Sequence, residues 1–304
     1  MFSLDQLRCF VAVAEELHFG RAAERLHMTQ PPLSRQIQRL EAAIGAELLE
    51  RNNRSVKLTP AGETTLVQAR ALLAHAEALP TAARRAAAGL TGTVRLGFTA
   101  TAALNVVDFA LATVEREVPG VHLSLREMVS SEQIEALEHG ELDLALLRPP
   151  VDLPGYESFA VHREALVLAA PADGPFGAGG TVGGSAHDGA PVALSALANA
   201  HLLMYSPTSA AYFHNLASGL VGNVALDSVQ YITQIPSMVA LVDAGRGVAL
   251  VPESASSLHF RNVVFRPLEG VAPDVVELHA CWRTIAETPA LRRVVRVLRE
   301  GPFR

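Results

Sequence analysis

Cysteine is scarce in this chain, and long apolar runs are absent. The two cysteines among 304 residues, Cys9 and Cys281, lie far apart in apolar patterns, which favours buried reduced thiols over a redox pair. No run of about twenty apolar residues occurs, so we expect no membrane span. Residues 1–5 do not show a basic stretch followed by an apolar one, so we expect no secretory signal. These absences predict a cytoplasmic protein.

The motifs of metal and catalytic sites are missing as well. The eleven histidines include no His-x-x-x-His pair, and no Cys-x-x-Cys occurs, so we expect neither a metal nor another cofactor. There is no Gly-x-Ser-x-Gly elbow and no phosphate-binding Gly-x-x-x-x-Gly-Lys run. The glycine-rich segment 177–184 follows no strand-to-helix pattern and does not indicate a nucleotide loop. An enzyme is the second hypothesis for this chain, and a transport binding protein, which would need an export signal, is the third.

An excess of positive charge is lacking too, since the formal net charge is −6. The charge is unevenly distributed. Residues 1–89 hold 11 Lys and Arg against 9 Asp and Glu, a net +2, whereas residues 90–304 hold 14 against 22, a net −8. Because attraction to phosphates is screened within about 8–10 Å at ordinary salt, a distant acidic part does not prevent the first part from binding nucleic acid. The small basic excess indicates that one copy alone binds weakly.

What the sequence does contain is a set of helical patterns in its first segment. Apolar residues recur at helical spacing over 4–17, and a short alanine-rich helix is expected over 20–26. A third helix follows a tight connection, with Leu33, Ile37, Leu40 and Ile44 on one face and Gln30, Ser34, Arg35 and Gln38 on the other. Such polar side chains suit base edges and phosphates. The pattern predicts a helix-turn-helix whose second helix lies in the major groove of DNA.

Capping residues bound this third helix. Thr29 is a suitable N-cap, and Gly45 is a suitable C-cap. Pro31 and Pro32 fall in the first turn, where a missing N–H leaves no intrahelical bond unmade.

A short hairpin is predicted over residues 48–59, with its turn over 50–55. A hairpin that follows a recognition helix is the wing of a winged helix-turn-helix, and Arg51, Arg54 and Lys57 make it positive. A surface hairpin with solvated charges is the alternative interpretation.

A long helix rich in Ala and Leu is expected over residues 61–88, after Thr59 and Pro60 as N-cap and first-turn proline. Pro80 predicts a kink or a break near Leu79. The helix carries an apolar seam suited to a partner helix, made of Leu66, Leu72, Leu73, Ala76 and Leu79. Gly89 and Gly92 mark a domain boundary.

From residue 93 onward, strand patterns alternate with helical ones. Strands are expected at 93–98, 121–128, 142–147, 201–205, 225–229 and 248–251, and helices at 102–118, 131–139, 210–220 and 236–244. This order predicts two similar α/β lobes, each with a parallel sheet covered on both faces, joined near 148–163 and again near 264–267. The segment 173–190, rich in Gly, predicts a mobile surface loop.

Taken together, these residues resemble the LysR-type transcriptional regulators over the whole chain. The motif comprises Phe10-Val11-Ala12-Val13-Ala14-Glu15, Phe19, Arg21-Ala22-Ala23, Leu26, Thr29-Gln30-Pro31-Pro32-Leu33-Ser34, Ile37, Leu40-Glu41, Gly45, Leu48-Leu49, Arg51 and Leu58-Thr59-Pro60-Ala61-Gly62. The run Gly245-Arg246-Gly247-Val248-Ala249-Leu250-Val251-Pro252 is similar to a loop and strand of the family's second lobe. Leu49 departs from the family's frequent Phe.

The resemblance implies an α/β protein in three parts. These are an N-terminal winged helix-turn-helix DNA-binding domain at 1–60, a linker or dimerisation helix at 61–89, and an effector-binding domain at 90–304 that resembles a two-lobed periplasmic binding protein. Lobe I then covers 90–160 and 268–304, and lobe II covers 161–267.

The resemblance also implies a transcriptional regulator that binds double-stranded DNA and is not an enzyme. It assigns DNA contacts to Gln30, Pro31, Pro32, Ser34, Arg35, Arg51 and Arg54. The chemistry agrees, because Gln pairs with adenine and Arg pairs with guanine or a phosphate; a solvated helix residue is the alternative for Ser34. Family members assemble through linker helices as dimers or tetramers, and several modules on one DNA sum their attraction.

An effector pocket is expected between the lobes, near strand carboxyl ends and helix amino ends. The residues at such places are Thr99, Thr101, Ser130, Ser131, Arg148, Ser206, Thr208 and Gln234. Two helix starts and a guanidinium favour an anion, most simply a carboxylate, so we expect an organic acid. The alternatives are that each Ser or Thr is only an N-cap and that Arg148 binds an acidic neighbour across the hinge. Effector binding is expected to change the lobe orientation and thereby the spacing or bend of DNA half-sites.

Overall fold

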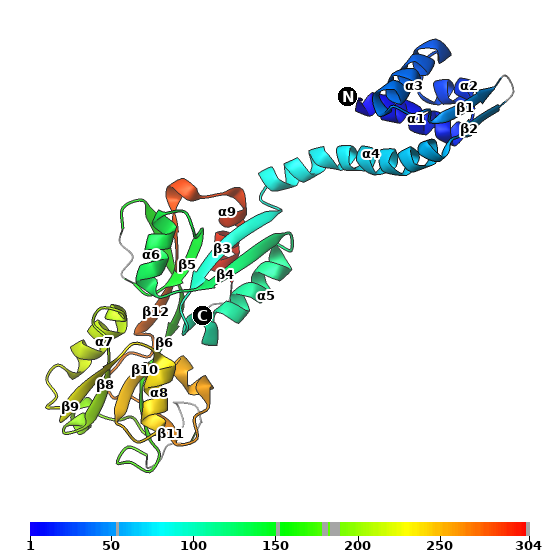
Figure 1. The fold of residues 1–304 in the computed structure, drawn as a ribbon. Coiled ribbons are helices and arrows are strands. Elements are labelled where there is room, and N and C mark those ends of the chain that lie inside the picture. The colour runs from blue at the N-terminus through cyan, green and yellow to red at the C-terminus, as the bar shows by residue number, and fades with distance from the viewer. Residues whose placement is uncertain (53–54, 150–152, 178–181, 183–188, 302–304) are drawn as a thin grey trace. The chain divides into compact units, whose positions relative to one another are not determined.

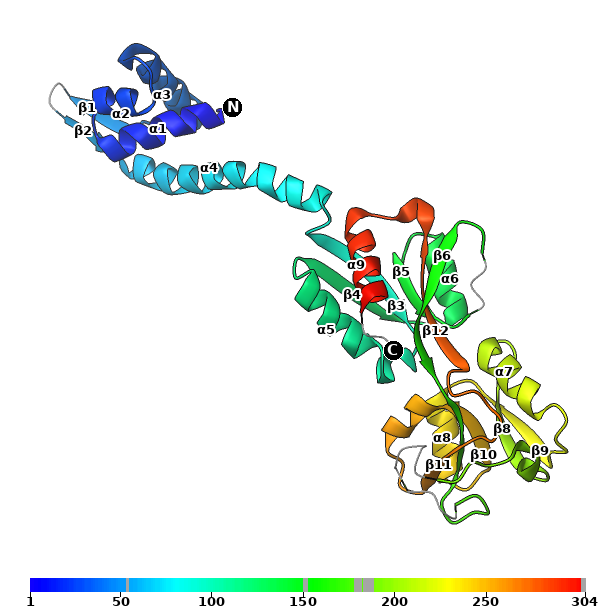
Figure 2. The same ribbon diagram turned by 180° about the vertical axis from the view of Figure 1, so that it is seen from behind.

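A computed structural model describes residues 1–52, 55–149, 153–177, 182 and 189–301. The chain divides into two compact units, Met1–Arg85 and Ala86–Arg304 (Figures 1 and 2). The loop predicted at 173–190 lies mostly outside the described residues.

The first unit is the winged helix-turn-helix that the sequence predicts. Its elements are α1 (Leu4–Glu16), α2 (Phe19–Arg25), α3 (Gln30–Ile44), β1 (Leu49–Asn52) and β2 (Ser55–Leu58). Phe10 of α1 and Leu33, Ile37 and Leu40 of α3 are fully buried in one core. Ile44, expected on the same apolar face, is 37% exposed because it lies in the last turn, beyond the reach of that core.

Local hydrogen bonds set the helix starts in this unit. Ser3 and Gln6 form a reciprocal capping box at α1, and His18 Nδ1 accepts the N–H groups of Gly20 and Arg21 at the start of α2. Thr29 occupies the N-cap position of α3 as predicted, but its hydroxyl makes no cap hydrogen bond. The reason is chemical: the two positions that such a hydroxyl would serve are prolines, which have no N–H to donate.

The hairpin and the next helix run further than the sequence indicates. Asn52 pairs with Ser55, so both strands extend into the region expected as turn. Helix α4 (Pro60–Ala87) is continuous through Pro80, so of the kink or break predicted there, the break is wrong. A proline removes one backbone hydrogen bond, and here the surrounding residues 77–85 are exposed, so water can satisfy the freed carbonyl.

Lobe I of the second unit is built on a five-stranded sheet of order β4-β3-β5-β12-β6. Its strands are β3 (Gly92–Phe98), β4 (Val121–Glu127), β5 (Leu144–Leu147), β6 (Tyr156–Glu164) and β12 (Val276–Arg283), and its helices are α5 (Val107–Glu117), α6 (Ser130–Glu138) and α9 (Pro289–Glu300). Leu144 and Leu146 pack in one core with residues of α5 and α9, while Ala145 and Leu147 pack in another with residues of α6. Figures 1 and 2 show α6 on one side of the sheet and α5 and α9 on the other. Because both faces of β5 are covered, all four of its residues are buried and apolar.

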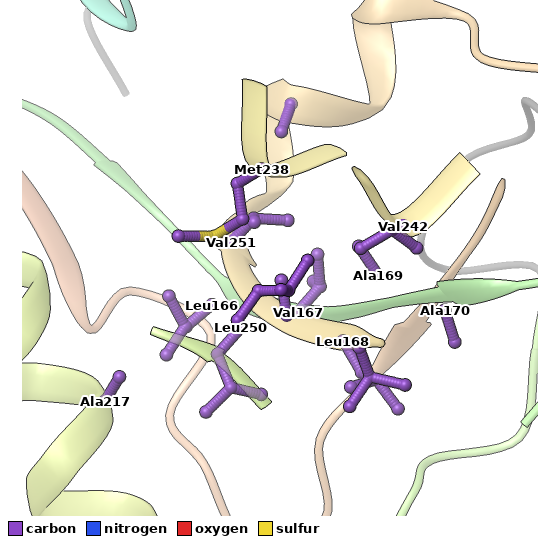
Figure 3. Close-up of a cluster of buried hydrophobic side chains, with 14 of the residues drawn as sticks. Leu166, Val167, Leu168, Ala169, Ala170, Ala217, Met238, Val242, Leu250 and Val251 are labelled. Atoms are coloured by element: carbon purple, nitrogen blue, oxygen red, sulfur yellow. The ribbon is translucent and has the colours of Figure 1, made fainter. Parts of the chain in front are cut away.

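Lobe II repeats the design with a sheet of order β11-β7-β10-β8-β9. Its strands are β7 (Leu166–Pro171), β8 (His201–Tyr205), β9 (Ser228–Ile232), β10 (Val248–Pro252) and β11 (Val263–Pro267), and its helices are α7 (Ala211–Val221) and α8 (Ile235–Asp243). Figure 3 shows part of its core, in which side chains of β7 and β10 meet Met238 and Val242 of α8.

The expectation of purely parallel sheets is wrong in both lobes. In lobe I, β12 is antiparallel to β5 and β6, and in lobe II, β7 is antiparallel to β10 and β11. These strands enter each lobe by crossing from the other one, which reverses their direction. The chain crosses first between β6 and β7, at Ala165, and returns between β11 and β12, over 268–275.

Candidate functional site

The outer face of α3 is open to solvent. Gln30, Pro31 and Arg35 are exposed, and Pro32 and Ser34 are half-buried. Within the described part of the chain, Arg35 forms no ion pair and keeps its charge available. The opposite face of α3 is buried in the core, which leaves the polar face as the one that can approach a duplex.

Two carboxylates, those of Glu41 and Glu15, join the elements of the DNA-binding unit to one another. Glu41 of α3 accepts the backbone N–H groups of Leu48 and Leu49 at 3.0 and 3.2 Å, so the hairpin starts at a set position relative to the helix. Lys57 of β2 is exposed on that hairpin. Arg54 and the side chain of Arg51 lie outside what the structure describes.

Glu15 holds the other side of the module. Its carboxylate pairs with Arg25 of α2 and with Arg70 of α4, both at 2.7 Å. These hydrogen bonds, that from Arg70 first, lower the pKa of Glu15. The ion pairs join α1 and α2 to the base of the long helix.

The second unit contains a cavity of about 500 Å³ lined by both lobes. That volume falls in the range of about 300–1,000 Å³ that small-molecule sites occupy. Seven of the eight residues predicted for the effector line it: Thr99, Thr101, Ser130, Ser131, Arg148, Thr208 and Gln234. Ser206 does not; its hydroxyl instead accepts the N–H of Ser209 at 3.3 Å, within the turn that precedes α7.

The apolar wall of the cavity was not apparent in the sequence. It includes Met128 and Ile134 from lobe I and Tyr205, Tyr212 and Phe213 from lobe II. Tyr212 and Phe213 lie at the start of α7, where the helical pattern alone does not distinguish a cavity wall from a core. Glu127 also lines the cavity, and no pattern in the sequence marked it as a cavity residue.

Arg148 is the most connected of the cavity residues, and it is only 6% exposed. Its Nη1 donates to the carbonyl of Glu277 at 2.8 Å, and its Nη2 donates to the hydroxyl of Thr101 at 3.2 Å. Nη2 also lies 3.6 Å from Oε1 of Glu164. The alternative considered for Arg148, an acidic neighbour at the hinge, is therefore present in the structure.

Both lobes meet at this ion pair. The guanidinium of Arg148 lies 5.0 Å from the ring centre of Phe213 in lobe II, close enough for a cation–π contact. The second oxygen of Glu164 accepts the N–H of Ser254 at 2.8 Å, in the 3₁₀ helix η4 (Glu253–Leu258) of lobe II. Burial lowers the pKa of Arg148, and Glu164 opposes that change.

The start of α6 offers donors as well as a carboxylate. The hydroxyl of Ser130 accepts the backbone N–H of Arg148 at 3.1 Å, and Glu132 accepts the N–H of Val129 at 3.3 Å. Among the described residues, the backbone N–H groups of Ser130 and Ser131 have no hydrogen-bond partner. A helix start with free N–H groups is a favourable place for an anionic oxygen.

No group of three or more His, Cys, Asp or Glu in the described chain could hold a metal ion. Nor does any described helix have the length and apolar character needed to cross a membrane. A winged helix-turn-helix joined to a two-lobed domain with a ligand-sized cavity defines a ligand-responsive DNA-binding regulator.

Comparison with known proteins specifies the family. Residues 4–63 match the model of the bacterial regulatory helix-turn-helix protein, lysR family, and residues 87–302 match that of the LysR substrate binding domain. Over 302 residues the chain is 37% identical to the HTH-type transcriptional regulator IlvR of Caulobacter vibrioides, covering 98% of this chain and 97% of that protein. It is 34% identical over 302 residues to the Hca operon transcriptional activator HcaR of Escherichia coli, with the same coverage of 98% and 97%.

A solved structure supports the same family. Full-length CbnR complexed with its target DNA matches with a TM-score of 0.81 at 28% identity, covering 98% of this chain and 99% of that one. The chain belongs to the LysR family of transcriptional regulators. It is a DNA-binding regulator with an effector-binding domain, and not an enzyme.

Proposed function

We propose that this regulator binds its operator through the exposed face of α3 and the wing, and that an organic acid in the 500 Å³ cavity modulates that binding. The observation that supports operator binding by α3 is that Gln30, Pro31 and Arg35 are exposed, whereas the opposite, apolar face of the helix is fully buried. We assign Pro32, Ser34, Arg51 and Arg54 to the same DNA surface. The solved CbnR complex supports a duplex as the partner.

An acid as effector is supported by the free N–H groups of Ser130 and Ser131 and by the hydroxyls around them. Thr99, Thr101 and Thr208 add hydroxyl groups to the same cavity. Such donors bind a carboxylate without needing a full positive charge nearby. This matters because the charge of Arg148 is already balanced by Glu164.

We further propose that the chain forms a dimer or a tetramer through α4 and acts in the cytoplasm, where chromosomal DNA is found. Leu72 and Leu79 of α4 are 45% and 67% exposed, and their seven-residue spacing places them on one face. Burial against a second α4 would remove these side chains from water. Two modules on one DNA would also offset the low charge of each.

The effector signal is proposed to pass through the hinge. Thr101 lines the cavity and accepts a hydrogen bond from Arg148, which contacts the carboxylate of Glu164 at the first crossing and the carbonyl of Glu277 after the second. A ligand that forms a hydrogen bond with Thr101 or Arg148 therefore changes the contacts that Arg148 makes with both crossing strands. Such a ligand shifts the lobe arrangement only if it binds one arrangement more tightly.

Thermal-shift screening of the full chain against a panel of organic acids tests the effector class. We expect at least one acid to raise the melting temperature of the wild type and to change its affinity for selected DNA. By linkage, DNA must then change the affinity for that acid by the same factor. If no acid in a broad panel raises the melting temperature, the organic-acid effector is rejected while the DNA-binding assignment stands.

A further inference from the structure

The charged side chains around the cavity carry more negative than positive charge. Within the described chain, the charged residues that line it are Arg148, Glu127 and Glu132. The positive charge of Arg148 is balanced by the carboxylate of Glu164, which lies 3.6 Å away and is 6% exposed. The carboxylates of Glu127 and Glu132 have no such counter-charge, so the wall carries an excess of two negative charges.

Both of these carboxylates are open to solvent. Glu127 and Glu132 are exposed, and the side chain of Glu127 forms no ion pair or hydrogen bond with any described residue. Oε2 of Glu132 accepts the backbone N–H of Val129 at 3.3 Å, while its Oε1 makes no hydrogen bond in the described part of the chain. A ligand can therefore approach these oxygens without breaking an ion pair.

The Glu132 carboxylate lies close to the proposed carboxylate site at the start of α6. Its Oε2 is 3.3 Å from the backbone N of Val129. The backbone N of the next residue, Ser130, is at most about 3.6 Å further on, so this carboxylate lies within about 7 Å of the free N–H of Ser130. Glu127 ends β4 three positions before Ser130, which keeps the two Cα atoms within about 11 Å of each other.

This charge balance distinguishes two kinds of acid. A plain carboxylate bound at Ser130 and Ser131 adds a third negative charge beside two others, and like charges at such distances repel more strongly as water is displaced. An acid that also carries an ammonium group adds no net charge. In an α-amino acid the two groups share one carbon atom, and with a hydrogen bond at each end they span about 8–9 Å. That span covers the separation between the free N–H of Ser130 and the Glu132 carboxylate.

The wall next to this place is apolar. Ile134 lies four residues after Ser130, on the same face of α6. Both line the cavity, as does Met128 just before the helix, and lobe II adds Tyr212 and Phe213. A ligand held at the start of α6 therefore meets apolar side chains beside its charged groups.

We propose that the effector is an α-amino acid with an apolar side chain. Its carboxylate accepts the N–H groups of Ser130 and Ser131, its ammonium group pairs with Glu132, and Glu127 adds a second negative charge nearby. Its side chain packs on Met128 and the neighbouring apolar wall. This assignment rests on the proposed organic-acid effector and narrows it to zwitterions.

Calorimetric titration of the full chain with matched pairs of compounds tests the assignment. The probes are valine, leucine, isoleucine, methionine, phenylalanine and tryptophan, each with the corresponding acid that lacks the amino group. We expect at least one of these amino acids to bind, at least tenfold more tightly than its plain acid. Its methyl ester, which has no carboxylate charge, is also expected to bind at least tenfold more weakly.

Two substitutions test the carboxylates directly. Glu132→Gln keeps an oxygen for the N–H of Val129 while removing the charge, and combined with Glu127→Gln it should reduce the preference for the amino acid to less than threefold. Glu135→Gln is the matched control, because it makes the same charge change at an exposed position of α6 that does not line the cavity. This control should keep the tenfold preference. A single cooperative melting transition shows that each variant is folded.

The assignment is rejected if none of the amino acids binds, or if a plain acid binds as tightly as its amino counterpart. A preference that survives the double substitution, or that Glu135→Gln removes equally, also rejects it. If another organic acid still raises the melting temperature of the wild type, the proposed effector class stands and only the zwitterion is lost. If no acid of any kind does so, both are rejected.

Discussion

Arg148 and Glu164 form a buried ion pair at the junction of the two lobes, with 3.6 Å between Nη2 and Oε1. Both side chains are almost wholly removed from solvent, at 4% and 6% exposure. The same guanidinium donates to the carbonyl of Glu277, so it contacts both strands that lead into the hinge, β6 and β12. A group that lies in the cavity wall and also holds both crossing strands is well placed to transmit binding to lobe orientation.

The first prediction concerns the cost of breaking this pair. Glu164→Gln leaves the Arg148 charge buried without a counter-charge, and we expect a loss of about 3–5 kcal/mol in the free energy of unfolding. Arg148→Met combined with Glu164→Gln removes both charges and should cost less than the sum of the single changes. Urea denaturation followed by the fluorescence of Trp282, the single and buried tryptophan, measures these values.

The exposed pair of Arg163 and Glu277 provides the control for that experiment. These side chains lie 2.8 Å apart but are 54% and 31% exposed. Arg163→Met should cost less than about 1 kcal/mol. A loss for Glu164→Gln that is no larger than this would show that the hinge pair has no special role.

The second prediction concerns DNA affinity. Arg35→Ala should weaken binding to selected DNA by about tenfold or more, because one base or phosphate contact of an arginine is worth about 1–3 kcal/mol. Arg8→Ala makes the same change of charge on α1, where Arg8 pairs with Asp5 at 2.9 Å, and should alter affinity less than threefold. Fluorescence anisotropy at two salt concentrations measures both. Equal losses for the two variants would indicate a general charge effect and not a specific contact.

The third prediction concerns assembly through α4. Leu72→Glu should dissociate the oligomer, because it places a charge in the proposed helix–helix seam. Ala74→Glu lies about 200° further around the same helix by its spacing, on an exposed position, and should leave assembly unchanged. Sedimentation velocity distinguishes these outcomes. A wild type that sediments as a monomer at micromolar concentration would contradict the proposed role of α4.

The fourth prediction concerns pH. The hydrogen bonds from Arg70 and Arg25 lower the pKa of Glu15 in the folded chain. A lowered folded pKa contributes stability that is present above the unfolded value of about 4.3 and is lost as pH falls through the folded value. The melting temperature of the wild type should therefore exceed that of Glu15→Gln at pH 7, and the difference should shrink progressively as the pH falls below about 4.3. A difference that stays constant as the pH falls below this value would mean that charge is not its source.

The sequence predicted the DNA-binding unit closely because its signals are local. The spacing of Leu33, Ile37 and Leu40 identifies the buried face of α3, and Gly45, at φ 81°, ends the helix where expected. Of the kink or break expected at Pro80, the break did not occur, because an exposed helix can lose one backbone hydrogen bond whose carbonyl then binds water. Local pattern alone cannot show that solvent is present at that turn.

The effector unit was less predictable because its architecture depends on distant pairings. Strands β6 and β12 were missed, and they pair with each other across more than a hundred residues of sequence, as Val276 with Glu164 shows. The hydroxyl and guanidinium residues of the cavity were found from their places after strands. The stacked rings of Tyr205 and Phe213 were not, because aromatic residues at a strand end and a helix start are equally typical of a core.

The most direct test of the whole account is a selection of duplexes from a random DNA library by the full chain, repeated with Arg35→Ala. We expect the wild type to enrich a two-fold symmetric motif with two half-sites, and the variant to fail to enrich it while remaining folded. If the wild type enriches no motif over the starting library, or if Arg35→Ala enriches the same motif equally, then α3 does not read DNA and the account is contradicted.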